Sequence, residues 1–145
     1  MGRGKNMKEY SILSHLVNRM QDRTLLSNQH NLAAVVVDKK GSPISFGFNS
    51  YDKTHPMQKF YNMGIKKEAI YLHAEISALV KCASTSSVAY GLIIARLSKE
   101  GKLRLAKPCK GCYKAILDSK IPKVYYTNNY GELVLLDTSI PLEEY

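Results

Sequence analysis

Residues 108–112 are Pro-Cys-Lys-Gly-Cys, and residues 73–75 are His-Ala-Glu. Each stretch stands at the predicted start of a helix, one near position 73 and one near position 109. Cys109 and Cys112 lie three positions apart, so both thiols fall on one face of their helix. The 36 positions that separate His73 from Cys109 leave room for one helix and one strand. The two stretches therefore predict one site to which two helix N-termini contribute.

Hydrophobic periodicity places the other elements around these two helices. The predicted helices cover residues 7–23, 73–83 and 109–119, and the predicted strands cover residues 31–37, 44–48, 88–97, 123–127 and 132–137. Residues 51–64 have no clean period and are predicted to form a long loop. This order predicts an α/β fold, a three-layer α-β-α sandwich with a mixed five-stranded sheet.

The last two predicted strands are separated only by Asn128-Asn129-Tyr130-Gly131. A loop of this length can join antiparallel neighbours, whereas parallel neighbours need a crossover of about a dozen residues or more. The sheet is therefore expected to end in an antiparallel hairpin.

Composition limits the class of protein. The chain has 145 residues, of which 45% are hydrophobic and 23% are charged. These values suit one domain, residues 1–145, and exclude a disordered or coiled-coil chain. No apolar run approaches the ~20 residues that cross a bilayer, and the basic N-terminus lacks a signal-peptide core, so a cytoplasmic protein without a membrane segment is expected. An odd number of cysteines, three, favours thiols or metal ligands over a disulfide scaffold.

The residue types in the two stretches suit a catalytic zinc site. His73, Cys109 and Cys112 supply three ligands, and a tetrahedral zinc ion with three protein ligands keeps one position for water. Zinc makes that water acidic enough to act near neutral pH. Glu75 can move protons between the water and a leaving amine, which is the chemistry of hydrolytic ammonia release. A structural zinc site would need Cys82 or His55 as a fourth ligand, and a redox Cys pair would leave His-Ala-Glu unexplained.

At these residues the sequence resembles the cytidine and deoxycytidylate deaminase superfamily, over residues 31 to about 137. Gly47-Phe48-Asn49 is similar to the family's Gly-aromatic-Asn segment, and residues 108–116 and 121–126 are similar to deoxycytidylate deaminases. The resemblance implies that His73, Cys109 and Cys112 bind Zn²⁺, that Glu75 is catalytic, and that the protein is a homo-oligomer. It also implies substrate contacts through three further residues, namely Asn49, Ala74 and Pro108.

Two departures from the family pattern concern the finer specificity. Ser77 stands where deoxycytidylate deaminases usually have Asn, and residues 50–53 are Ser-Tyr-Asp-Lys where their Gly-rich segment continues. The sequence around the zinc cysteines is similar to deoxycytidylate deaminases, while the terminal hairpin resembles free-nucleoside cytidine deaminases. Both act on small cytosine substrates. The resemblance therefore implies hydrolytic deamination of a cytosine nucleoside or nucleotide to its uracil form.

The net charge of +9 keeps a nucleic-acid substrate open as an alternative. A deaminase that edits adenosine or cytosine in RNA or single-stranded DNA would suit a basic chain. An inactive relative with structural zinc is a further alternative, against which the intact Glu75 argues.

The densest basic run extends from Arg96 to Lys110 and leads into the zinc cysteines, where it could bind a single phosphate. His55 could contact substrate from its loop or be solvated, and Cys82 is expected to pack in the core.

Overall fold

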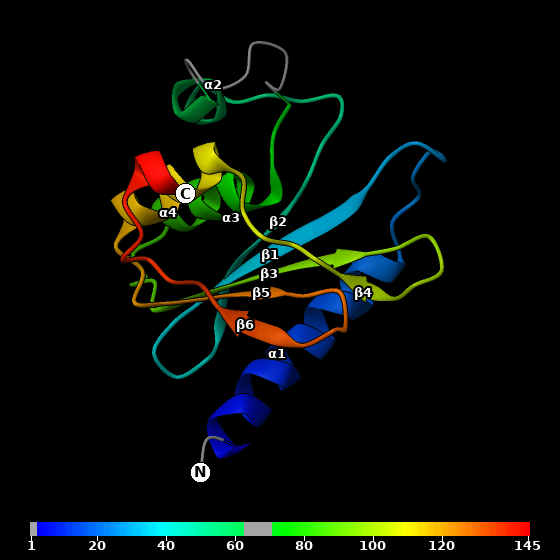
Figure 1. The fold of residues 1–145 in the computed structure, drawn as a ribbon, viewed down its shortest axis with the longest axis horizontal. Helices are drawn as coiled ribbons and strands as arrows, with labels where there is room; N and C mark the ends of the chain where they lie inside the picture. Colours follow the sequence, from blue (N-terminus) through cyan, green and yellow to red (C-terminus); the bar gives the residue numbers. More distant parts are fainter. Residues whose placement is uncertain (1–2, 63–70) are drawn as a thin grey trace.

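The computed structural model describes residues 3–62 and 71–145, and side chains from residue 8 onward at the N-terminal end. Its helices are α1 (Arg3–Gln21), α2 (Pro56–Asn62), α3 (Ala74–Ala83) and α4 (Lys110–Ser119), with a 3-10 turn, η1 (Leu142–Glu144). Its strands are β1 (Asn31–Val37), β2 (Pro43–Phe48), β3 (Gly91–Leu97), β4 (Leu103–Arg104), β5 (Lys123–Thr127) and β6 (Leu133–Leu135). Helix α1 lies on one face of the sheet, and α2, α3 and α4 lie on the side of the other face (Figure 1). The predicted α-β-α sandwich is confirmed.

The sheet is mixed, with the strand order β2-β1-β3-β5-β6. β1 pairs antiparallel with β2 and with β3, and β3 pairs parallel with β5. The last pair, β5 and β6, is antiparallel, with Tyr126 opposite Val134. The hairpin predicted from the short connection is therefore confirmed.

Apart from Asn31 and Arg96, the two central strands are apolar because both of their faces are covered. Alternate residues of β1 and β3 face α1 in one core, which contains Ala33, Val35, Val37, Ile93, Ala95 and Leu97. The intervening residues face α3 and α4 in a second core, which contains Ala34, Val36, Leu92 and Ile94 together with Tyr113 and Ile116 of α4. Alternation with a period of two follows from the pleat of a strand.

The prediction of five strands was wrong by one. Leu103 and Arg104 form the short strand β4, which pairs antiparallel with the end of β3. β3 itself begins at Gly91, three residues later than predicted, and Val88 is exposed. A two-residue strand has too few positions to display an alternating pattern, so periodicity gave no signal for it.

The prediction of one long loop over residues 51–64 was also wrong where the structure describes it. Residues 56–62 form α2, and Pro56 is its first residue. Proline suits this position because its missing N–H would have no partner inside the helix. The last two residues of the predicted loop lie outside the described residues. A seven-residue helix shows too little of the helical period to be recognised from sequence.

No helix among the described residues is long and apolar enough to cross a membrane.

Candidate metal centre and active site

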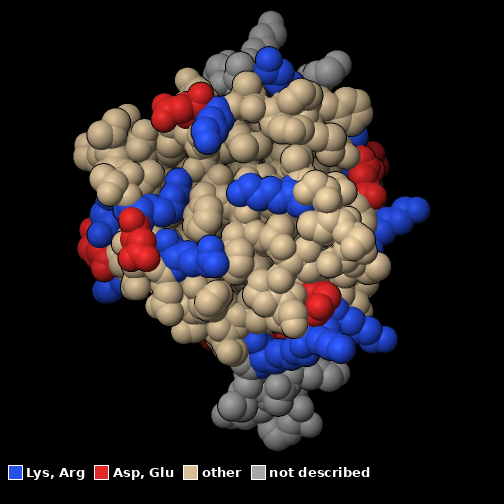
Figure 2. Space-filling model, turned by 180° about the vertical axis from the view of Figure 1, so that it is seen from behind, with Lys and Arg blue, Asp and Glu red and all other residues tan. Residues whose placement is uncertain are grey.

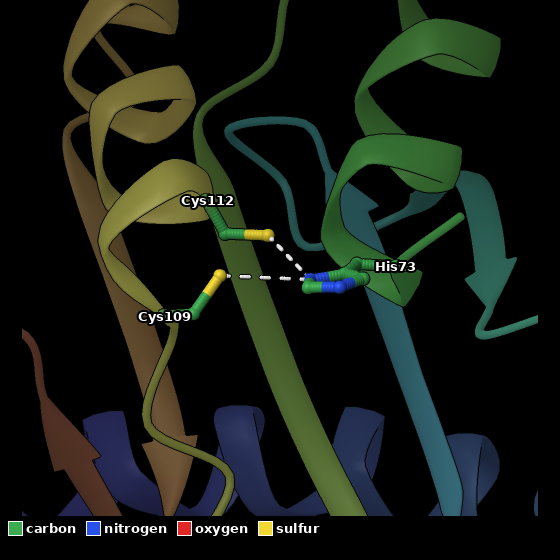
Figure 3. Close-up of side chains that lie close together, drawn as sticks. All are labelled: His73, Cys109 and Cys112. Atoms are coloured by element: carbon green, nitrogen blue, oxygen red, sulfur yellow. Dashed lines mark hydrogen bonds between the residues drawn. The ribbon is translucent and has the colours of Figure 1, made fainter. Parts of the chain in front are cut away.

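The ends of α3 and α4 bring the three predicted metal ligands together. His73 is the N-cap of α3 and Cys109 is the N-cap of α4, and both have extended backbones, with ψ of 156° and 171°. Cys112 lies in the first turn of α4. All three side chains point toward one point between the two helices (Figure 3). The helices thus aim their N-termini, which carry partial positive charge, at the site.

The geometry fits a tetrahedral zinc ion. The Nδ1 atom of His73 lies 3.3 Å from the sulfur of Cys112 and 3.6 Å from the sulfur of Cys109. Zinc–nitrogen distances of about 2.0–2.1 Å and zinc–sulfur distances of about 2.3 Å place two such donors about 3.6 Å apart at a tetrahedral angle. The three donor atoms lie within 4.8 Å of one another. His73 therefore presents Nδ1, and not Nε2, to the metal position.

The site has one closed side and one open side. Cys112 is fully buried, whereas Cys109 is exposed. A cavity of about 290 Å³ opens beside His73, Glu75 and Cys109. The open side is where a fourth ligand or a substrate can approach, as in catalytic zinc sites.

Neither residue considered as a fourth ligand joins this group. Cys82 of α3 belongs to the core that contains Ala34 and Val36 of β1, so its predicted packing role is confirmed. His55 caps α2, where its Nδ1 accepts a hydrogen bond from the Met57 N–H at 3.0 Å. His55 also lines a different cavity, together with Cys82. In the part of the chain that the structure describes, the group of candidate ligands has only His73, Cys109 and Cys112.

The two thiols differ in acidity. A hydrogen bond from Cys112 and the neighbouring His73 lower the pKa of Cys109 to about 4, against the opposing effect of desolvation by the surrounding protein. The pKa of Cys112 is raised well above its usual value, first by the hydrogen bond with Cys109 and then by burial. One thiolate is thus already favoured, and a divalent cation would stabilise the second.

Glu75 lies in the first turn of α3 and is only 4% exposed. Burial raises the pKa of its carboxyl to about 7, while its own backbone hydrogen bond and the nearby His73 oppose that rise. The carboxyl lines the same cavity as His73 and Cys109. A buried carboxyl with a pKa near neutrality, next to a metal position, is suited to both accept and donate a proton.

Helix α2, which the sequence did not reveal, supports the ligand His73. Gln58 is fully buried, and its Oε1 accepts the His73 backbone N–H at 2.8 Å. Its Nε2 donates to Oδ1 of Asn62, which is also buried. The hydrogen bond to Asn62 orients the Gln58 amide, and Gln58 in turn holds the backbone of His73 at the start of α3.

Two glycines allow this close packing. A Cβ atom on Gly111, between the zinc cysteines, would lie 2.8 Å from Oδ1 of Asn62 and 2.9 Å from the Tyr61 carbonyl. A Cβ atom on Gly47 of β2 would lie 2.3 Å from the Ala74 carbonyl. Gly111 and Gly47 therefore stand at positions where the backbone of one element lies directly against another element, with no room for a side chain.

The structure places the three predicted substrate contacts differently. Asn49 and Ala74 line the cavity beside Glu75. Pro108 is buried and does not belong to the cavity lining; its carbonyl accepts a hydrogen bond from the Tyr145 hydroxyl. Pro108 is therefore not one of the residues that line the cavity, although its neighbours Lys107 and Cys109 are.

The cavity also contains residues that the sequence did not single out as contacts. Its wall includes Leu32, Tyr51, Tyr71 and Leu72, and the rings of Tyr51 and Tyr71 are 6.3 Å apart. Lys107 is the member of the basic run 96–110 that lines it. Tyr125 and Tyr126 of β5 pack against the two cores and do not line this cavity.

An α/β sandwich with a His-Cys-Cys group and a buried carboxyl at two helix N-termini has the features of a zinc deaminase. The sequence model of the cytidine and deoxycytidylate deaminase zinc-binding region matches residues 7–128. The chain therefore belongs to the cytidine and deoxycytidylate deaminase family, which binds zinc. The comparison with curated proteins finds no match.

Solved structures support the same fold. The dCMP deaminase from the cyanophage S-TIM5 is 25% identical, with a TM-score of 0.51 over 85% of this chain and 83% of that one. The cytidine deaminase from Burkholderia pseudomallei is 12% identical, with a TM-score of 0.60 over 90% and 92%. The cytidine deaminase from Mycobacterium leprae is 12% identical, with a TM-score of 0.54 over 88% and 92%. The two cytidine deaminases are similar to this chain in fold alone.

Proposed function

We propose that this protein is a zinc-dependent hydrolase that deaminates a cytosine nucleoside or nucleotide to its uracil form and releases ammonia. The observation that carries the proposal is the position of Glu75. Its buried carboxyl, with a pKa of about 7, shares one cavity with the metal ligands His73 and Cys109. Family membership supports the reaction class, and the cyanophage protein was solved in complex with dCMP and dUMP.

In this proposal His73, Cys109 and Cys112 hold the metal. A bound zinc ion supplies a water nucleophile that is acidic enough to react near neutral pH. Glu75 accepts one proton from the attacking water and delivers it to ring N3. It then takes the proton of the new C4 hydroxyl and passes it to the 4-amino group, which leaves as ammonia when the C4–N bond breaks. The cavity beside it holds the pyrimidine, with Ala74 and Asn49 in its wall. The first N–H groups of α3 and α4 add positive potential where negative charge develops.

A small substrate is favoured over a nucleic acid. The cavity of about 290 Å³ has the scale of a small-molecule site. On the face seen in Figure 2, Lys and Arg side chains form separate groups with neutral and acidic surface between them. Within the basic run, Lys99 is hydrogen bonded to two backbone carbonyls and Arg96 to a third. This arrangement argues against one continuous strip for a polyanion.

The test is a substrate panel of cytidine, deoxycytidine, their 5′-monophosphates and a cytosine-containing oligonucleotide. Conversion is followed by the ultraviolet change from cytosine to uracil and, independently, by ammonia release. We expect turnover of at least one small substrate by the zinc-loaded protein. Turnover of the oligonucleotide alone, with a steep loss at higher salt, would support the editing alternative instead. Zinc binding without turnover of any substrate would support an inactive relative.

A further inference from the structure

Arg23 lies just beyond the end of α1, far in sequence from the metal ligands, yet it reaches the wall of the active-site cavity. Its Nη2 donates to the Asn49 carbonyl at 2.7 Å, and its Nη1 donates to Oδ1 of Asn49 at 2.8 Å. Nη1 also donates to Oδ1 of Asn31 at 2.9 Å and lies 3.3 Å from the Leu32 carbonyl. We name these four residues, Arg23, Asn31, Leu32 and Asn49, the Arg23 cluster.

The cluster fixes which way the Asn49 amide points. Oδ1 of Asn49 accepts from Arg23 and also from the Leu32 N–H at 3.1 Å, so both of its lone pairs are used. Nδ2 donates one hydrogen to the His30 carbonyl at 2.9 Å. An amide nitrogen carries two hydrogens, so Asn49 keeps one N–H that has no partner among the described residues. The group that Asn49 can offer to a ligand is therefore a donor.

The guanidinium of Arg23 lies 5.2 Å from the centre of the Phe48 ring and is surrounded by neutral groups. Arg23 is about half buried, and burial lowers the pKa of its guanidinium. The hydrogen-bond partners that the structure gives it are all neutral oxygens. Burying a cation is unfavourable unless it gains strong bonds. Here the charge faces the oxygen of Asn49, which polarises the amide and makes its remaining N–H a better donor.

We infer that Arg23 is a positioning residue for substrate binding. It holds Asn49 so that the free N–H faces the cavity and donates to a sugar hydroxyl of the substrate. Arg23 itself does not line the cavity, whereas Asn49 does. Arg23 therefore acts through Asn49. This inference rests on the proposed function, because a sugar hydroxyl is present only if a cytosine nucleoside or nucleotide binds there.

The experiment compares three proteins, the parent, R23K and R19K. Lysine keeps the charge of Arg23 but cannot donate in the forked geometry that joins the carbonyl and Oδ1 of Asn49. Arg19 lies one turn earlier and stacks over the Phe46 ring at 3.9 Å, so R19K is the matched control. Each protein is assayed with cytidine, 2′-deoxycytidine and 3′-deoxycytidine for kcat and KM. Binding of the same three compounds is measured by calorimetry in the E75Q background.

We expect the parent and R19K to prefer the nucleoside that keeps the contacted hydroxyl by about 3- to 10-fold in kcat/KM, the range of one hydrogen bond. In R23K this preference should fall to about 1, through KM and through the binding constant, with kcat changed little. A loss of stability alone would lower kcat/KM equally for all three substrates and would leave the preference between them unchanged.

Two results would overturn the inference and can be told apart. If R23K keeps the hydroxyl preference of the parent, Arg23 has no positioning role, and the proposed function stands. If the parent neither binds nor converts any of the three cytosine nucleosides or their monophosphates, the proposed function fails, and the role of Arg23 fails with it. R23Q, which removes the charge, provides a second variant should R23K fold poorly.

Discussion

The metal side and the Arg23 side of the cavity are built in different ways. On the metal side, the three ligands and Glu75 come from two short stretches, residues 73–75 and 109–112, each at a helix N-terminus. On the other side, the Arg23 cluster draws on three separate places in the chain: the end of α1, the start of β1 and the residue after β2. On the metal side, Gln58 of α2 accepts a hydrogen bond from the His73 backbone. On the Arg23 side, the cavity wall rests on a half-buried cation.

This difference separates chemistry from recognition. On the metal side, each of the two stretches places its side chains within a single helical turn, and Gln58 of α2 supports His73. The Arg23 side depends on hydrogen bonds between residues that are 8 to 26 positions apart in sequence. We therefore expect changes on the metal side to abolish turnover and changes on the Arg23 side to alter substrate preference. The following variants test that division, from the largest expected effect to the smallest.

C112A should abolish turnover and zinc binding at equimolar metal. Cys112 is the fully buried ligand, and two remaining ligands cannot complete a tetrahedral site. Zinc content is measured by plasma emission spectrometry, and stability by denaturation with and without a chelator. C82A is the matched control, since Cys82 is a buried core thiol outside the ligand group. Full zinc content in C112A would contradict the assignment.

E75Q should retain zinc and lose about 10²- to 10⁴-fold in kcat, the usual contribution of a general acid and base. Glutamine has nearly the same shape but cannot move a proton. The measurement combines steady-state kinetics with zinc analysis of the same sample. Turnover at the parental rate would show that Glu75 does not carry the proton transfers.

Q58L should destabilise the protein by about 2–3 kcal/mol, because it leaves the His73 N–H and the Asn62 oxygen without their buried partner. Zinc affinity should fall by about 10-fold, as expected when an outer contact of a ligand is lost. Competition with a chromogenic chelator measures the affinity. K59A, on the exposed side of the same helix, should match the parent. An unchanged affinity in Q58L would limit Gln58 to a structural role.

K107A should have the smallest effect. Lys107 is exposed at the cavity and its Nζ lies 5.0 Å from the ring of Tyr145. Exposed charge pairs contribute little, so KM for cytidine 5′-monophosphate should rise by only about two- to fivefold. KM for cytidine should not change. K110A is the control from the same basic run. Equal effects on both substrates would mean that Lys107 does not contact the phosphate.

The same contrast explains which parts of the fold and of the site could be predicted from the sequence. His73, Cys109 and Cys112 were grouped correctly because residue type and spacing within a helix constrain them. The five longer strands and the terminal hairpin followed from the period of two and from loop length. Helix α2 and strand β4 were missed because each is too short to display a period.

Long-range hydrogen bonds leave no local signal. Nothing around Arg23 in the sequence indicates that its guanidinium reaches Asn49, 26 positions later. Gln58 likewise looks like any polar residue, although it is fully buried against His73. The best available signal was Gly47-Phe48-Asn49, whose glycine permits the close approach of α3 and whose asparagine lines the cavity.

The two outer strands of the sheet have a consequence for how copies of this chain can associate. At one edge β6 has only three residues. At the other edge β2 begins with Pro43, which has no N–H to donate, and the pairing of β1 with β2 is irregular at Val36/Val37. Lys81 of α3 also donates to the Phe46 carbonyl of β2 at 3.1 Å. Short, bulged or proline-bearing edges resist the addition of a further strand. Any assembly of this protein should therefore join helices and loops, and its sheet should not extend from one copy to the next.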